Sequence, residues 1–244
     1  MGRAIELCNI YKAFEDNQVL QGLDLGIEGG EILTILGGSG TGKSVLLKLM
    51  IGLLKPDAGQ ILIEGEDIVP LREGELLQVR RKVGMLFQGS ALFDSLSVKE
   101  NVAFPLREHT RMTEAEIRDR VGEVLALVGM AGAEEKYPGE LSGGMRKRVG
   151  LARAIALIPR IVLYDEPTTG LDPRNVDKIN ELITDLRAKL QVTSVVVTHD
   201  LQSTFRISDR IALLFQGQIT ATGTPVEIGH SEHPAVQEFL AGHL

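Results

Sequence analysis

The sequence has one cysteine, no excess of positive charge and no apolar run long enough to cross a bilayer. Cys8 is the only cysteine among 244 residues. It excludes an intrachain disulfide and a cysteine metal cluster, and it fits a reducing compartment. The formal net charge of −7 at pH 7 argues against a nucleic-acid binder, which usually presents a basic face. We therefore expect no nucleic-acid partner.

Long hydrophobic segments are missing as well. Arg3 and Glu6 interrupt any apolar segment at the start of the sequence, so we expect no signal peptide. The most apolar windows, 45–54 and 124–133, are too short for a membrane span and are expected to form core helices. Any role at a membrane is therefore expected at its surface, through another chain.

A glycine-rich segment, residues 37–44, is the most informative feature that is present. It has the pattern G-x-x-x-x-G-K-[ST] and lies between an apolar run and an apolar, helix-like stretch. In the order strand, turn, helix, this pattern predicts a phosphate cradle, because backbone N–H groups and the helix N-terminus both favour anions. Lys43 supplies a full charge for the outer phosphates, and Ser44 offers a hydroxyl to Mg²⁺. The candidate nucleotide-binding residues here are Gly37, Gly38, Ser39, Gly40, Thr41, Gly42, Lys43, Ser44 and Val45.

Apolar runs alternate with helical segments from residue 31 onward, which is typical of a parallel sheet. Each run lacks polar alternation, as expected of strands covered on both faces. The runs are 32–36, 83–87, 161–164 and 194–198. Antiparallel or shorter strands are predicted at 3–10, 19–27, 60–64, 210–216 and 218–221. We therefore expect an α/β fold with a mainly parallel sheet and a small antiparallel β subdomain.

The strand pattern fades between residues 89 and 158. Thr113 is a candidate N-cap for a helix at 113–129, and a second helix is predicted at 144–157. The sequence thus predicts a single domain, 1–244. In it an α-helical subdomain, 89–158, is inserted into an α/β core made of 1–88 and 159–244.

Polar side chains follow three of the predicted parallel strands. Asp165 and Glu166 end one strand, His199 follows a second and Gln88 a third. Ligands collect at the carboxyl ends of strands in open α/β sheets, so these side chains are expected near the phosphates. Asp165 is placed to hold the metal ion or its water, and Glu166 to orient the attacking water as general base.

The other two positions leave alternatives open. His199 is interpreted as a sensor of the terminal phosphate, although a plain surface histidine followed by Asp200 as a helix N-cap is the alternative. Gln88 can reach Mg²⁺ or the attacking water, or it is an ordinary loop residue.

A second candidate anion site lies at residues 142–144, just before a helix whose first turn carries three cations, Arg146–Arg148. These cations oppose the helix dipole. We interpret the arrangement as an anion held by the N–H groups of Gly143 and Gly144 and the hydroxyl of Ser142; a solvated basic turn is the alternative. Since the glycine-rich loop already holds a nucleotide, each triphosphate is expected to lie between that loop and this turn of a second copy, in a homodimer.

With these motifs in this order, the chain resembles the nucleotide-binding subunits of ABC transporters over essentially its full length. The matching segments are 37–44 as Walker A, Gln88 as Q-loop, 141–145 as signature, Asp165-Glu166 at the end of Walker B, Leu171-Asp172 as D-loop and His199 as H-loop. The resemblance implies a P-loop NTPase core with ATP and Mg²⁺ as cofactors, and ATP hydrolysis coupled to transport. It assigns catalysis to Lys43, Glu166 and His199, and Mg²⁺ to Ser44, Gln88 and Asp165.

Two assignments that rest on the resemblance have alternatives. The aromatic ring that stacks on adenine is assigned to Phe14, with Tyr11 as the other candidate. The Asp172-Pro173 pair also fits an N-cap with proline at the first helical position.

One position departs from the family's signature, which usually ends in Gln, whereas this chain has Met145. The same Met, together with 91–98, 101–108 and 233–242, resembles the ATPases of MCE-type lipid importers, the Mla-like phospholipid transport group. This implies partnership with integral permease subunits and an MCE-domain substrate-binding protein, at the cytoplasmic face of the bacterial inner membrane. The alternatives are another class of ABC importer or exporter, and a soluble ABC ATPase without a permease.

The helical subdomain offers two apolar segments for the contact with a permease helix. They are 91–93 and 104–106. They are expected either to line the permease cleft or to belong to the core of the subdomain.

Overall fold

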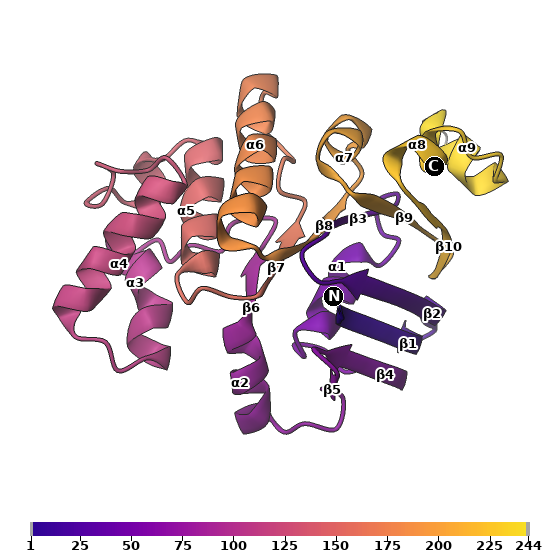
Figure 1. Cartoon of the computed structure of the whole chain (residues 1–244), viewed down its shortest axis with the longest axis horizontal. Helices are drawn as coiled ribbons and strands as arrows, with labels where there is room; N and C mark the ends of the chain where they lie inside the picture. Colours follow the sequence, from indigo (N-terminus) through magenta and orange to yellow (C-terminus); the bar gives the residue numbers. More distant parts are fainter. Residues whose placement is uncertain (1, 243–244) are drawn as a thin grey trace.

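The computed structural model describes residues 2–242, with a six-stranded sheet at its centre (Figure 1). Its strands are β3 (Ile32–Leu36), β6 (Val83–Leu86), β7 (Ile161–Asp165), β8 (Thr193–Thr198), β9 (Arg210–Phe215) and β10 (Gln218–Gly223). The strand order is β10-β9-β3-β8-β7-β6. β10 is antiparallel to β9, and the other neighbours are parallel. Every residue of β3, β7 and β8 is buried, which is why these strands read as continuous apolar runs.

A second, antiparallel sheet has the order β2-β1-β4-β5. Its strands are β1 (Arg3–Phe14), β2 (Asn17–Glu28), β4 (Ala58–Ile63) and β5 (Glu66–Asp67). The apolar residues of this sheet pack with α1 (Lys43–Met50) and one face of the central sheet in a single buried cluster. The helix that follows the glycine-rich loop is therefore fixed between the two sheets.

The chain between β6 and β7 forms a helical lobe (Figure 1). Its elements are α3 (Val98–His109), α4 (Glu114–Leu127), the 3₁₀ helix η1 (Pro138–Glu140) and α5 (Gly143–Ile155). Thr113 caps α4 and accepts a hydrogen bond from the Glu116 N–H, as its type and position predict. The lobe shares a buried cluster with the other face of the central sheet, so it is packed against the core.

The remaining helices are α2 (Glu73–Lys82), α6 (Pro173–Leu190), α7 (Leu201–Ile207), α8 (Pro225–Gly229) and α9 (Pro234–Leu240). α6 links β7 to β8, which are parallel neighbours, as expected for a strand–helix–strand unit. α6 covers the face of the central sheet opposite α1.

The predicted α/β fold is confirmed, while several element bounds differ from expectation. The strands expected at 3–10 and 19–27 extend to the turn between them. The window 124–133 is not one helix: α4 ends at Leu127, and the chain turns at Gly129 with φ 66°. α2, α3, α8 and α9 were not predicted. α2 is strongly polar, with only Leu76 and Val79 buried, so its helical period is hard to detect in the sequence.

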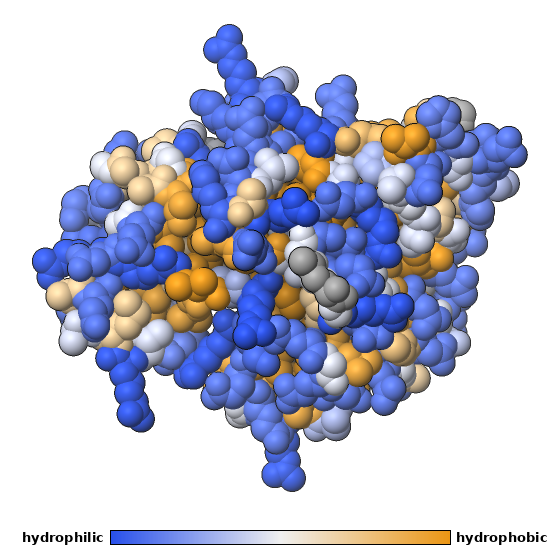
Figure 2. Space-filling view, viewed as in Figure 1, coloured by the Kyte–Doolittle hydropathy of each residue, from blue (hydrophilic) through white to orange (hydrophobic). Residues whose placement is uncertain are grey.

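The face shown in Figure 2 is mostly hydrophilic, with apolar side chains showing between polar ones over the helical lobe. Within residues 2–242, no helix combines the length and hydropathy needed to span a bilayer.

Ile158 holds a strained backbone conformation that can be relieved by substitution. Its φ is 54° and its side chain is 61 % exposed. A left-handed conformation costs a residue with a Cβ about 1–2 kcal/mol, and asparagine tolerates it better. We expect Ile158→Asn to raise the free energy of unfolding by about 1 kcal/mol, and Tm by about 2–4 °C, in thermal denaturation. Val226→Asn is the control, because Val226 is 70 % exposed in α8 without positive φ. An equal gain in both variants would contradict the strain argument.

Candidate functional site

Four parallel strands end at the same edge of the central sheet and bring the predicted polar residues together. The loop 37–44 follows β3, Gln88 follows β6, Glu166 follows β7 and His199 follows β8. Because β8 lies between β3 and β7, His199 emerges between the glycine-rich loop and Glu166. This edge is where ligands bind in open parallel sheets.

A cavity of about 390 Å³ opens at this edge. It is lined by Phe14, Val19, Ser39, Gly40, Gly42, Lys43, Ser44, Val45, Gln88, Glu166 and His199. Nearly all of these residues are candidates from the sequence; Val19 was not predicted. As far as residues 2–242 show, neither Tyr11 nor the turn 142–144 contributes to this lining.

The glycine-rich loop closes around its own lysine. Lys43 is 6 % exposed, and its Nζ donates to the carbonyl oxygens of Gly37 at 2.7 Å and Gly38 at 2.8 Å. Gly42 has φ 99°, and a Cβ there would lie 2.6 Å from Val19 Cγ1, so only glycine fits. Burial lowers the pKa of Lys43, although nearby Glu166 opposes this. An entering phosphate would offer this cation a stronger partner than the carbonyls.

Ser44 and Asp165 meet in the position where a metal ion is expected. Ser44 Oγ donates to Asp165 Oδ1 at 2.8 Å. Burial raises the pKa of Asp165, and the Ser44 hydrogen bond partly offsets this. Within the described residues, no three His, Cys, Asp or Glu side chains form a metal cluster. This donor set of hydroxyl and carboxylate fits Mg²⁺, which usually takes one or two protein oxygens and completes its shell with phosphate and water.

Glu166 is the most constrained side chain of the site. Its Oε2 accepts from the hydroxyls of Thr198 at 3.1 Å and Thr169 at 3.0 Å. Its Oε1 lies 3.0 Å from His199 Nδ1 and 3.5 Å from Lys43 Nζ. Burial acts to raise the pKa of Glu166, but His199 and Lys43 outweigh it and hold that pKa below its usual range. The carboxylate is therefore ionised at neutral pH and able to accept a proton from water.

Asp200 and Asp172 take the cap positions that the sequence allowed for them. Asp200 caps α7, where it accepts from Gln202 N and Ser203 N. Asp172 caps α6, and Pro173 occupies the first helical position. A role of Asp172 between subunits stays a prediction.

The turn 142–144 is the N-terminus of α5, with Ser142 as its cap. The three cations of its first turn, Arg146–Arg148, are held within the chain. Each donates to a backbone carbonyl of the same chain: Arg146 to Leu141, Arg148 to Gly129, and Lys147 to Gln88 and Glu166.

Met145 lies half-buried against the core of the helical lobe. Its side chain contributes apolar contact there, where the usual amide of the signature would need a polar partner. Anion binding by Ser142, Gly143 and Gly144 stays a prediction.

The two aromatic candidates in β1 have different surroundings. Phe14 lines the cavity, and Lys12 Nζ lies 5.3 Å from its ring centroid. Tyr11 lies over Gly22, where a Cβ would be 2.8 Å from its hydroxyl. The geometry thus favours Phe14 as the ring available to stack on adenine.

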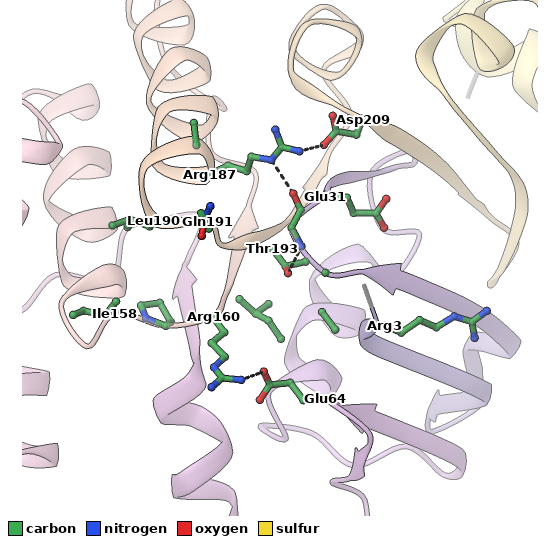
Figure 3. A pocket seen from close by; sticks show the side chains of 17 residues that line it. Arg3, Glu31, Glu64, Ile158, Arg160, Arg187, Leu190, Gln191, Thr193 and Asp209 are labelled. Carbon is green, nitrogen blue, oxygen red and sulfur yellow. Dashed lines mark hydrogen bonds and ion pairs between the residues drawn. The ribbon is translucent and has the colours of Figure 1, made fainter.

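A larger hollow of about 1160 Å³ lies at the opposite ends of the parallel strands (Figure 3). Its three arginines are all paired: Arg160 with Glu64 at 2.8 Å, Arg187 with Asp209 at 3.3 Å and Arg3 with Glu6 at 2.9 Å. These carboxylates neutralise the charge, so the hollow does not resemble an anion site.

The profile of the ABC transporter family matches residues 20–169. This chain belongs to that family. A probable ribonucleotide transport ATP-binding protein, mkl, of Mycobacterium leprae is 46 % identical over 99 % of this chain and 70 % of its own length. The intermembrane phospholipid transport system ATP-binding protein MlaF of Haemophilus influenzae is 43 % identical over 98 % of this chain and 90 % of its own.

A solved structure of the same family supports the fold. The ATP-binding cassette MJ0796, dimeric and bound to ADP and Pi in a post-hydrolysis state, is 34 % identical, with a TM-score of 0.84. The match covers 91 % of this chain and 98 % of that one. The P-loop NTPase fold and the prediction of an ABC ATPase, which binds ATP and couples its hydrolysis to transport, are confirmed.

Sequence reasoning missed three groups that hold Glu166. Thr169 and Thr198 bind its carboxylate, and Lys147 binds its carbonyl oxygen at 2.9 Å. Thr198 directly precedes His199 at a strand end, a position that offered a signal. Lys147 offered no such signal, because it lies 19 residues from Glu166 in a basic turn whose sequence is typical of a solvent-exposed surface.

Proposed function

We propose that this ABC ATPase drives phospholipid transport of the MCE type, as a homodimer on the cytoplasmic face of a bacterial inner membrane. The observation that carries the proposal is the similarity to the phospholipid transport ATPase, which extends over 98 % of this chain and 90 % of that protein. Met145 and the segments 91–98, 101–108 and 233–242 support the same subfamily.

Lys43 binds the outer phosphates in the proposed site. It leaves the carbonyls of Gly37 and Gly38 for the nucleotide, while the N–H groups of the loop and of α1 surround the phosphates. Phe14 stacks on adenine. Ser44, Gln88 and Asp165 hold Mg²⁺, which neutralises phosphate charge when bound.

Glu166 is assigned as the group that orients the attacking water and accepts its proton. Its carboxylate is held by two threonine hydroxyls and faces both His199 and Lys43. His199 is assigned to the terminal phosphate and to the water's geometry. A ligand favours the closed dimer only if it binds the closed state more tightly than the open one. Hydrolysis removes the terminal phosphate from these contacts, so the closed dimer loses this stabilisation and opens.

A second copy completes each site. Ser142 is exposed at the start of α5, and within one chain its turn does not line the described cavity. The proposed dimer places Ser142, Gly143 and Gly144 on the partner's nucleotide. The dimeric state of the cassette bound to ADP and Pi supports this arrangement.

The proposed contact site for the permease is an aromatic surface formed by Phe93 and Phe104. Both rings are exposed, with centroids 4.9 Å apart. The loop that carries Phe93 is fixed by buried Asn101, which accepts from the Phe93 N–H and donates to its carbonyl. Leu106, by contrast, is buried in the lobe. Clustered exposed aromatic side chains close to the loop that carries Gln88 fit a helix of a partner protein.

We expect Phe93→Ser to lower recovery of the subunit with its permease by roughly tenfold or more, since a buried aromatic often dominates an interface. The measurement is affinity purification from detergent-solubilised membranes of cells that express the whole transport system. Val226→Ser, which removes an exposed apolar side chain in α8, is the control. Recovery of the permease at the wild-type level with Phe93→Ser would contradict the assignment of this surface as the permease contact.

The transported substrate is tested on the purified complex. We expect mass spectrometry to find an MCE-domain protein and bound phospholipid, and phospholipid vesicles to change its ATPase rate. The 46 % identical relative makes ribonucleotide transport the second candidate. Stimulation by ribonucleotides other than ATP, without bound lipid, would favour it and contradict the lipid proposal.

A further inference from the structure

One side of α5 lies against the loop that follows β6. Lys147, Gly150 and Arg153 are spaced three residues apart, so they share one side of the helix. Gly150 allows the close approach, since a Cβ there would lie 3.1 Å from Ser90 Cβ and 3.3 Å from its carbonyl oxygen. Helix and loop are thus in direct contact, and a side chain at position 150 would force the loop to shift.

Two cations of α5 hold the backbone of this loop. Arg153 donates to the carbonyls of Ser90 at 2.9 Å and Ala91 at 2.8 Å. These two residues have φ of 63° and 46°, conformations that persist only where the surroundings fix them. Lys147 donates to the carbonyl of Gln88, the residue that faces the cavity.

Lys147 also holds the other side of the site. Its Nζ donates to the Glu166 carbonyl at 2.9 Å, and Glu166 itself has φ 46°. Lys147 is 5 % exposed and makes no ion pair among the described residues. Burial lowers its pKa, and the nearby carboxylates of Asp165 and Glu166 oppose this. A buried ammonium shared between two carbonyls costs desolvation, so its presence at this point needs a reason beyond stability.

We propose that Lys147 is a positioning residue for ATP hydrolysis, which links the helix that starts at Ser142 to the backbone of Gln88 and Glu166 in the same subunit. The start of α5 then moves together with the water-orienting carboxylate and the Gln88 loop. When the partner's nucleotide engages Ser142, the geometry of the subunit's own site changes with it. This inference rests on the proposed roles of Glu166, Gln88 and the turn 142–144.

The test compares Lys147→Met, which keeps the apolar stem, with Lys147→Arg, which keeps the charge and the donors. For Lys147→Met we expect kcat to fall about 10- to 100-fold, the loss typical of a misplaced catalytic group, while KM and ATP affinity stay within about twofold. Lys147→Arg should recover most of the lost kcat. Lys147→Gln replaces Lys147→Met if the latter does not fold.

Arg148→Gln is the matched control, because it removes a cation from the same turn that donates to the distant Gly129 carbonyl and not to the loop at Gln88 or to Glu166. Turnover is expressed per ATP-binding site, from titration with a fluorescent ATP analogue. A purely structural role would lower the number of binding sites and leave kcat per site unchanged, which would overturn the inference. Wild-type kcat in Lys147→Met would overturn it as well.

Glu166→Gln, measured in parallel, separates this inference from the proposed function. If Glu166→Gln hydrolyses ATP normally, the proposed site assignment fails. If Glu166→Gln is inactive while Lys147→Met is fully active, only the role of Lys147 fails.

Discussion

Replacing Glu166 with glutamine is expected to lower the rate of ATP hydrolysis by roughly 10²–10⁴-fold, the contribution typical of a general base. Glutamine has the same shape, and its carbonyl can still accept from Thr198 or Thr169, whose hydroxyls hold Oε2 in the native chain. It cannot accept a proton from water. ATP binding should persist, because the Lys43 cradle stays intact and loses a competing carboxylate 3.5 Å away.

Phosphate release at saturating ATP measures the loss, and size-exclusion chromatography with ATP measures the dimer. We expect Glu166→Gln to accumulate as an ATP-bound dimer, because the bound state no longer decays through hydrolysis. Glu232→Gln, which removes an exposed carboxylate near α9, should behave as wild type. Turnover within threefold of wild type in Glu166→Gln would show that another group activates the water.

Replacing Lys43 with alanine is expected to weaken ATP binding by about 10- to 100-fold, since a hydrogen bond to a charged group contributes roughly 1.5–3 kcal/mol. Hydrolysis should be lost with it. The native cation is buried among the carbonyls of Gly37 and Gly38 and beside Glu166. Alanine would leave Glu166 as an unbalanced negative charge facing the phosphates.

Equilibrium titration with a fluorescent ATP analogue measures the change in Kd for Lys43→Ala. Lys178→Ala, an exposed lysine of α6, is the control for loss of a positive charge. A Kd unchanged from wild type would mean that the phosphates do not lie at Lys43, and the nucleotide site would have to be placed elsewhere.

The sequence predicted the features that depend on neighbouring residues. The cradle at 37–44 needs consecutive N–H groups and a following helix, and both are encoded within one segment. The cap at Thr113 depends on Glu116 three residues later. The fully buried strands β3, β7 and β8 are visible as apolar runs, and their parallel connection follows from the helices between them.

The sequence could not predict which way a side chain points where a strand or helix has two possible faces. In β1, register shifts interrupt the pairing with β2 between Ile10 and Tyr11 and between Lys12 and Ala13, so alternation could not show which aromatic ring faces the cavity. In the lobe, Phe93 is exposed and Leu106 is buried, although the two segments have similar composition.

Lys147 shows most clearly what only the tertiary structure decided. In the sequence, Lys147 belongs to the basic first turn of a predicted helix, and that local pattern favoured an anion bound at the start of this helix. Its partners, the carbonyls of Gln88 and Glu166, lie 59 and 19 residues away. Only the packing of α5 against the ends of β6 and β7 brings them within reach. The sequence by itself determined the strand–loop–helix junction at which we propose that phosphate binds, because that chemistry is local. The fold determined which cations, rings and hydroxyls surround it, because burial and long-range contact select one face of each element.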